Sequence, residues 1–143
     1  MKATVLLRVA AVLALLHGIG HTVGGVFGAA APGAQETAML AMKMNRFDAM
    51  GTTRSYWDFF MGYGLFITVN FLVQAVVFWQ LASMAKVDAV RTRPIMMAFC
   101  VGYVAYAVLA WRYFFVGPVV LEGVIALCLL GAWVVAGRTQ QSS

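Results

Sequence analysis

Four long runs of apolar residues make up most of this 143-residue chain and limit its fold more than any other feature. The runs cover about residues 4–30, 56–82, 95–115 and 119–136. Each is close to the roughly 20 residues that an α-helix needs to cross the hydrocarbon core of a bilayer. Backbone polar groups find no water there, so such segments pair them internally as helices. We therefore predict an all-α fold, an integral membrane four-helix bundle forming a single transmembrane domain, 1–143.

The composition excludes nucleotide-binding α/β domains and separate soluble enzyme domains. Hydrophobic residues make up 63% of the chain and charged residues 10%, whereas soluble domains average about 45–50% apolar and about 25% charged residues. The net charge of +5 does not indicate nucleic-acid binding, because the basic residues stand at the ends of apolar runs, where membrane topology places them. The expected partner is membrane lipid, and no nucleic acid is expected.

The distribution of basic residues predicts the orientation. Three regions that four spans would place on one side contain Lys2, Arg8, Lys86, Arg91, Arg93 and Arg138. Cytoplasmic segments of membrane proteins are enriched in Lys and Arg. We expect a protein integral to the bacterial cytoplasmic membrane, with both termini cytoplasmic. We also interpret the first run as a retained helix and not a signal peptide, because it continues well past Leu16.

The long connection 31–55 has helical character of its own. Leu40, Met44 and Phe47 stand at i, i+4 and i+7, which forms an apolar stripe on a helix. We predict a short amphipathic helix from Gln35 to Met50 on the outer membrane surface. Between the last two runs, residues 116–118 predict a tight turn, with the proline in the first turn of the next helix.

Two histidines in the first run are the strongest candidates for chemistry. His17 and His21 are four residues apart, so they share one face of a regular helix. Gly20, Gly24 and Gly28 fall near the same face, and small residues permit close helix packing, inside one chain or in a homo-oligomer. Ionisable groups inside membranes are costly and normally face a bundle interior. The pair is either functional, as acid–base groups, ligand anchors or metal ligands, or structural.

The second run begins with a carboxylate whose role has two readings. Asp58 follows Ser55 by three residues, the spacing of a capping box, and it is also a candidate base. Tyr56 and Trp57 fit an interfacial aromatic belt. Asn70 lies four residues before a glutamine, and interhelical hydrogen bonds explain this pair better than ligand contact does.

The third and fourth runs carry two further charges near their expected outer ends. Because a tight turn joins the runs, Arg112 and Glu122 fall in one layer, and we predict that they form an ion pair. Tyr103 and Tyr106 share a helix and are favoured as packing residues over cavity residues. Cys100 and Cys128 are interpreted as small apolar residues and not as a disulfide.

At about 1.5 Å per residue, each span contributes a polar residue or pair to one half of the bilayer. We predict a polar pocket in the outer half, lined by His17, His21, Asp58, Arg112 and Glu122. The candidate catalytic residues are His17, His21, Asp58 and Glu122, and the candidate ligand contacts are Tyr56, Trp57, Asn70, Tyr106 and Arg112. No cofactor is predicted. A metal on His17 and His21 is the less favoured alternative, because the pair lacks the glutamate of an H-E-x-x-H site.

The sequence resembles a family of small bacterial four-helix integral membrane proteins of similar length. The motifs that carry the resemblance are residues 17–22 (HGIGHT), 45–51, 54–65 (beginning RSYWDF), 79–82 and 111–115. The resemblance implies a four-helix membrane protein and implies no activity.

Two functional hypotheses follow from these features. The first is a small membrane protein that binds or acts on a hydrophobic, lipid-like molecule, with a histidine as acid or base. The alternative is a non-catalytic accessory or structural subunit of a larger membrane complex. Whether the protein is an enzyme is left open.

Overall fold

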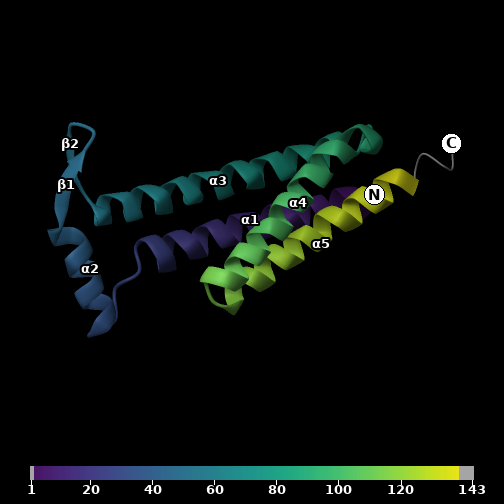
Figure 1. The fold of residues 1–143 in the computed structure, drawn as a ribbon. Helices are drawn as coiled ribbons and strands as arrows, with labels where there is room; N and C mark the ends of the chain where they lie inside the picture. Colours follow the sequence, from purple (N-terminus) through teal and green to yellow (C-terminus); the bar gives the residue numbers. More distant parts are fainter. Residues whose placement is uncertain (1, 139–143) are drawn as a thin grey trace. The chain divides into compact units, whose positions relative to one another are not determined.

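The computed structural model describes residues 2–138 (Figure 1). Its elements, in chain order, are α1 (Lys2–Gly20), the π-helix η1 (His21–Val26), α2 (Ala34–Met44), β1 (Arg46–Ala49), β2 (Thr52–Ser55), α3 (Tyr56–Met84), α4 (Ala89–Tyr113) and α5 (Val116–Arg138). Four helical segments are long and apolar enough to cross a membrane: Ala3–Val26, Tyr56–Met84, Ala89–Tyr113 and Val116–Arg138. The predicted all-α membrane fold with four spans is confirmed.

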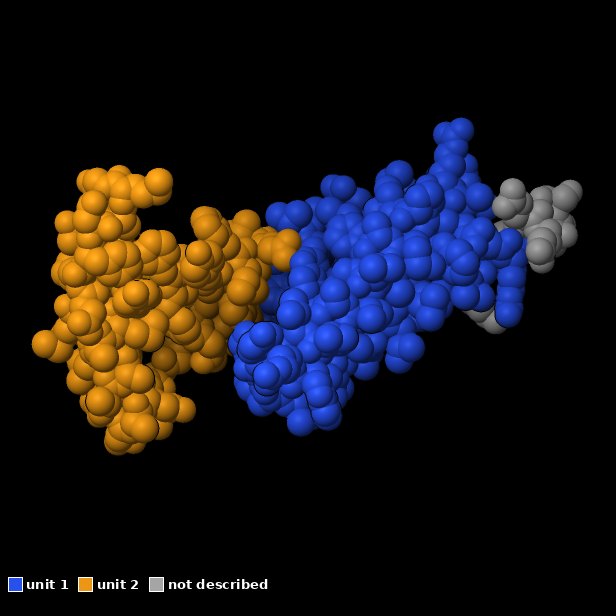
Figure 2. Space-filling model, in the orientation of Figure 1, with its two compact units in different colours: residues 1–17, 71–143 blue, residues 18–70 orange. Residues whose placement is uncertain are grey.

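The chain divides into two compact units, which we describe separately (Figure 2). Unit 1 contains the described part of residues 1–17 and 71–143, and unit 2 contains residues 18–70. Unit 1 therefore takes in most of α1, the second half of α3, and all of α4 and α5. Unit 2 takes in η1, α2, the two strands and the first half of α3.

The core of unit 1 forms where its helices pack through alternating large and small side chains. α4 and α5 lie side by side as an antiparallel pair joined at Phe114–Phe115 (Figure 1). Its fully buried apolar side chains include Leu7, Phe78, Met96, Ile125 and Leu129. Buried alanines such as Ala10 and Ala132 bring the backbones close, and van der Waals packing is the main attraction between helices in lipid.

Unit 2 contains a β-hairpin that the sequence pattern did not predict. The expected amphipathic helix to Met50 is wrong beyond Met44: the chain turns out of α2 at Asn45, whose side-chain nitrogen donates to the Ala41 carbonyl at 2.7 Å. β1 and β2 then pair antiparallel. Met50 and Gly51 between them have φ of 56° and 85°, as two-residue hairpin turns that match strand twist require.

The ends of three spans also differ from expectation. The first span ends at Val26 and not at Ala30. The third starts at Ala89 instead of 95, because the Asp88 side chain caps it by accepting from the Arg91 backbone N–H at 3.2 Å. The turn expected at 116–118 lies two residues earlier, and Pro118 is in the first turn of α5 as predicted.

The π-helix changes which residues of the first span face a neighbour. A π-helix has i→i+5 hydrogen bonds, so faces projected from a regular α-helix no longer hold beyond Gly20. Within the chain, the predicted close packing at the glycine face is wrong, since a Cβ added at Gly20 or Gly24 would meet no packing partner within 4 Å in the described structure. A role of these glycines in a homo-oligomer stays a prediction. A close approach between η1 and α3 in unit 2 is at Gly64, where a Cβ would lie 2.8 Å from Val26 Cγ2.

Candidate functional site

A buried histidine–carboxyl pair joins the first and last helices of unit 1. His17 Nδ1 on α1 lies 3.3 Å from Glu122 Oε1 on α5. The two residues are 9% and 4% exposed. Such placement inside a bundle is what an ionisable residue in a membrane requires, and the predicted interior position of His17 is confirmed.

The predicted Arg112–Glu122 ion pair is wrong, because Glu122 pairs with His17 instead. Arg112 is exposed on the last turn of α4, and its guanidinium carbon lies 5.7 Å from the ring centroid of Tyr113. The cause is rotational. Arg112 follows Tyr103 by nine residues, or two and a half helical turns, so the two side chains lie on opposite sides of α4. Tyr103 is fully buried. Arg112 therefore points away from the interior in which Glu122 lies.

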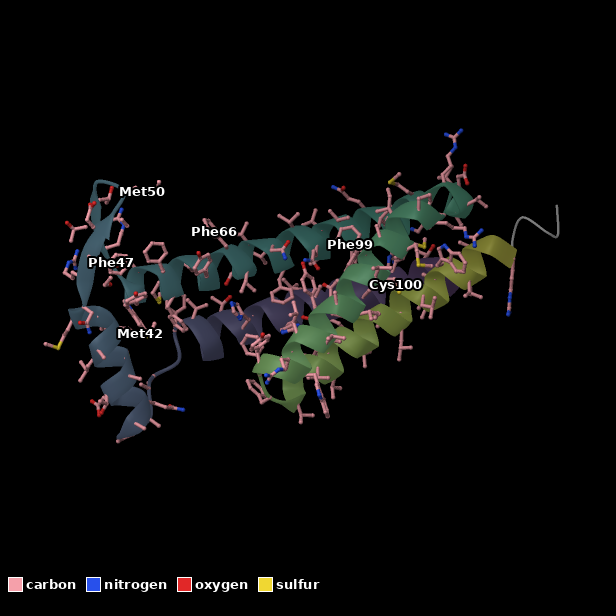
Figure 3. The ribbon with its side chains drawn as sticks, viewed as in Figure 1. Met42, Phe47, Met50, Phe66, Phe99 and Cys100 are labelled. Carbon is pink, nitrogen blue, oxygen red and sulfur yellow. The ribbon has the colours of Figure 1, made fainter. Side chains whose placement is uncertain are left out.

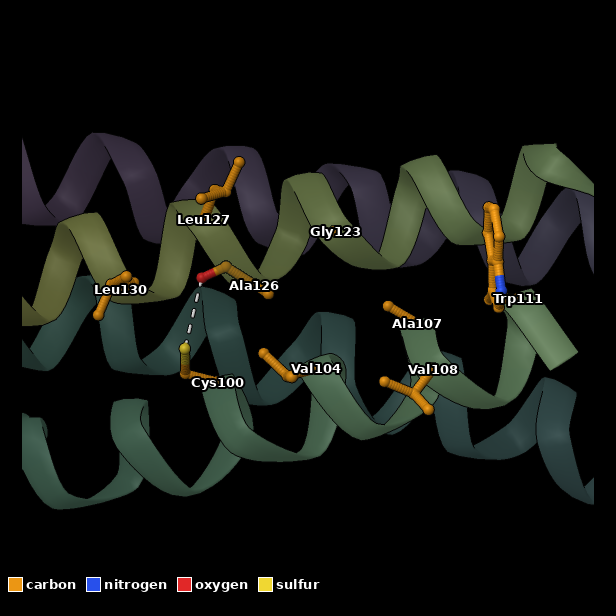
Figure 4. Close-up of a pocket in the computed structure, with 9 residues that line it drawn as sticks. All are labelled: Cys100, Val104, Ala107, Val108, Trp111, Gly123, Ala126, Leu127 and Leu130. Carbon is orange, nitrogen blue, oxygen red and sulfur yellow. Dashed lines mark hydrogen bonds between the residues drawn. The ribbon is translucent and has the colours of Figure 1, made fainter.

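Tyr103 lies in the same layer as Glu122. Cys100 lies on α4 (Figure 3), and its thiol donates to the Ala126 carbonyl of α5 at 3.5 Å, which fixes the register of the two helices (Figure 4). From this contact, Tyr103 is about one turn along α4 and Glu122 one turn along α5, both toward the connection between the helices. The Tyr103 ring is fully buried, and its hydroxyl has no hydrogen-bond partner among the described residues.

In the sequence of α3, Gln74 lies between Phe71, which contacts His17, and Phe78, which contacts Tyr103. The Phe71 ring is 4.3 Å from the His17 ring, and the Phe78 ring is 5.8 Å from the Tyr103 ring, centroid to centroid. Gln74 is 4% exposed and belongs to the same buried face of α3. Within residues 2–138, its Oε1 has no hydrogen-bond partner.

Besides the buried Thr4 and Thr92, each of the four helices in unit 1 buries one larger polar side chain: His17, Gln74, Tyr103 and Glu122. We call His17, Gln74, Tyr103 and Glu122 the polar core. Unpaired buried polar atoms are rare in folded proteins, yet Gln74 Oε1, Tyr103 Oη and Glu122 Oε2 are all buried without a hydrogen-bond partner in the described part of the chain. Together these residues carry a hydroxyl donor, two acceptor oxygens and a histidine–carboxylate pair.

His21 has a different environment. Its Nε2 lies 3.0 Å from the Gly64 carbonyl oxygen in unit 2, which also accepts from the Thr68 hydroxyl at 3.1 Å. Thr22 adds a second link between η1 and α3, with its hydroxyl 2.9 Å from that of Thr68. These contacts favour the structural reading for His21, whereas His17 belongs to the polar core.

Asp58 forms the predicted capping box at the start of α3. Its Oδ2 accepts from the Ser55 backbone N–H at 2.8 Å and from the Ser55 hydroxyl at 3.0 Å. In return, the Asp58 backbone N–H donates to the Ser55 hydroxyl at 3.2 Å. The capping role is confirmed, and a role of Asp58 in chemistry stays a prediction.

The predicted ligand contacts lie outside the polar core. In unit 2, the Tyr56 ring is 4.9 Å from the Phe47 ring of β1, and Lys43 Nζ is 4.5 Å from the Trp57 ring. Asn70 is exposed. In unit 1, the half-exposed Tyr106 ring is 5.7 Å from the Tyr103 ring. The polar core instead contains Tyr103, whose spacing favoured a packing role, and Gln74, the glutamine four residues after Asn70, whose spacing favoured an interhelical hydrogen bond.

Comparison of the chain with models of protein families, with curated proteins and with solved structures finds no match. Over residues 2–138, no group of three or more His, Cys, Asp or Glu side chains is placed to hold a metal ion.

Proposed function

We propose that the protein binds a small hydrophobic, lipid-like molecule whose polar group enters the polar core of unit 1. The observation that carries this proposal is the set of buried, unpaired atoms on Gln74, Tyr103 and Glu122 beside the His17–Glu122 pair. Unpaired buried polar groups cost about 1–3 kcal/mol each. A ligand that pairs with them recovers this free energy.

The available atoms favour a hydroxyl or carbonyl group on the ligand. A hydroxyl can donate to Gln74 Oε1 or Glu122 Oε2 and accept from the Tyr103 hydroxyl, and a carbonyl can accept from the same hydroxyl. Binding sites for small molecules are mostly apolar with a few convergent polar groups. The surroundings of the polar core fit this description, since its neighbours include Phe71 and Phe78.

The His17–Glu122 pair adds acid–base capability to this site. A carboxylate at 3.3 Å stabilises the protonated imidazole and holds the ring in one orientation. His17 would act as proton donor or acceptor for the bound polar group, and Glu122 would position it. In the predicted orientation of the chain, the site lies toward the outer half of the bilayer of a bacterial cytoplasmic membrane.

Native mass spectrometry of gently extracted protein tests this proposal with a matched pair of variants. Gln74→Leu removes an unpaired buried acceptor with little change in volume, so the variant is expected to fold. Asn70→Leu makes the same kind of change one turn away at an exposed position. We expect a retained lipid-like mass in wild type and Asn70→Leu, and its loss in Gln74→Leu. Equal retention by all three proteins would contradict the proposal.

A structural role is the second candidate, favoured by the position of the ion pair between α1 and α5. In an accessory subunit of a larger membrane complex, the pair would only hold these helices together. This role predicts that Gln74→Leu changes no retained mass and that Glu122→Gln weakens assembly with a co-purifying partner. The same native mass measurement separates the two functions.

A further inference from the structure

An apolar groove runs along the surface of the α4–α5 pair in unit 1 (Figure 4). Its volume is about 470 Å³. Residues from both helices line it: Cys100, Val104, Ala107, Val108, Trp111, Gly123, Ala126, Leu127 and Leu130. Small residues such as Ala107 and Gly123 form the floor of the groove, and larger side chains such as Trp111 form its borders.

The length of the groove matches one leaflet of a bilayer. The lining residues on α4 extend from Cys100 to Trp111, which corresponds to about 16 Å at 1.5 Å per residue. Half of a hydrocarbon core of about 30 Å is about 15 Å. An acyl chain that enters from the Trp111 end therefore finds an apolar surface over its full depth.

The Trp111 end of the groove carries a cation without an acidic partner. Arg112 is exposed, and no carboxylate of residues 2–138 lies within ion-pair distance of it. It follows Val108, a lining residue, by one helical turn, so it lies on a flank of the groove. An arginine beside an interfacial tryptophan is suited to a phosphate group, which its guanidinium binds in bidentate fashion.

We infer that the α4–α5 groove binds an acyl chain of an anionic phospholipid, with the lipid phosphate on Arg112. The volume of the groove favours an acyl chain over a helix from a second copy of the protein. A helix about 10 Å wide and 16 Å long occupies about 1,200 Å³, more than twice the volume of the groove. Such a helix would lie over the groove without filling it, whereas a single chain fits inside.

This site is distinct from the polar core. Glu122 contacts α1 through His17, whereas its neighbour Gly123 lines the groove. The inference thus goes beyond the proposed function, and variants of Gly123 and Gln74 test the two separately.

Matched glycine variants test whether the groove holds the chain. A Cβ at Gly123 meets nothing within 4 Å of the described residues, and neither does one at Gly102. Gly123→Leu fills the groove, and Gly102→Leu makes the same change at a position of α4 outside its lining. Wild type and variants are titrated in detergent with phosphatidylglycerol or phosphatidylcholine of identical chains, and native mass spectrometry measures the fraction that binds one lipid.

We expect wild type to bind phosphatidylglycerol about tenfold more tightly than phosphatidylcholine, because both lipids carry the phosphate but the choline cation of phosphatidylcholine repels the Arg112 guanidinium and competes for that phosphate. Arg112→Gln should remove this preference, and Gly123→Leu should weaken both lipids. Gly102→Leu and Gln74→Leu should bind as wild type does. The inference is overturned if Gly123→Leu binds normally, if Gly102→Leu loses as much affinity, or if Arg112→Gln keeps the preference. It is also overturned if wild type is a dimer that Gly123→Leu dissociates, because a second copy then covers the groove.

Discussion

At the scale of single residues, the His17–Glu122 pair places two ionisable side chains in the interior of unit 1. The carboxyl group lies 3.3 Å from the imidazole, so each group compensates the other in the interior, and removing one leaves an uncompensated buried group. The glutamate was a site candidate on sequence grounds, but its partner depends on helix rotation. Spacing along the chain predicts that Arg112 and Glu122 lie at the same depth in the bilayer. It does not predict that their side chains point in different directions.

Loss of Glu122 should therefore be costly. We expect Glu122→Ala to lower the free energy of unfolding by about 3–5 kcal/mol, measured by denaturation in mixed micelles. Arg112→Ala is the control, because its side chain is exposed and forms no ion pair within residues 2–138, and its effect should be within about 0.5 kcal/mol. Similar losses for both variants would show that the pair contributes no special stability.

The capping box gives a second prediction at this scale. Ser55→Ala removes hydroxyl contacts to Asp58 in both directions, so the start of α3 should fray and the melting temperature should fall by roughly a few degrees. Ser83→Ala, whose hydroxyl donates only to the Trp79 carbonyl in the last turn of the same helix, should leave the melting temperature nearly unchanged. If Ser83→Ala lowered it as much, the fall would not come from the cap.

At the scale of elements, hydropathy alone predicted the four spans because their length leaves no alternative in a bilayer. It failed where local chemistry overrides periodicity. Phe47 continues the apolar spacing of α2, yet Asn45 ends the helix and Phe47 lies on β1, stacked at 5.9 Å on Phe59. The π-helix could not be predicted either, because the spacing of apolar residues in so short a segment does not distinguish i→i+5 from i→i+4 hydrogen bonds.

The hairpin turn depends on a glycine. Gly51 has φ of 85°, which a β-branched residue rarely adopts, so Gly51→Val should destabilise the hairpin by roughly 1–2 kcal/mol. The measurement is hydrogen exchange of the amides of residues 46–55. Gly62→Val is the control, because a Cβ there meets nothing within 4 Å in the described structure. The turn geometry is contradicted if Gly51→Val leaves exchange as slow as in Gly62→Val.

At the scale of the whole molecule, the orientation in the membrane is a prediction from the basic residues. Met50 and Val87 are 102% and 92% exposed and belong to successive connections, which four spans place on opposite sides. In a background lacking Cys100 and Cys128, Met50→Cys should react with a membrane-impermeant maleimide on intact cells. Val87→Cys should react only after permeabilisation. The reverse pattern would invert the predicted orientation.

The central claim is that the polar core receives the polar group of a lipid-like molecule. Photo-crosslinking with a long-chain alcohol that carries a diazirine beside its hydroxyl tests it directly, because the reactive carbon then lies where the hydroxyl binds. We predict crosslinks within residues 71–78 and 100–106, lost in Gln74→Leu and kept in Asn70→Leu. Crosslinks confined to the exposed surfaces of the helices, with no change in Gln74→Leu, would contradict the claim.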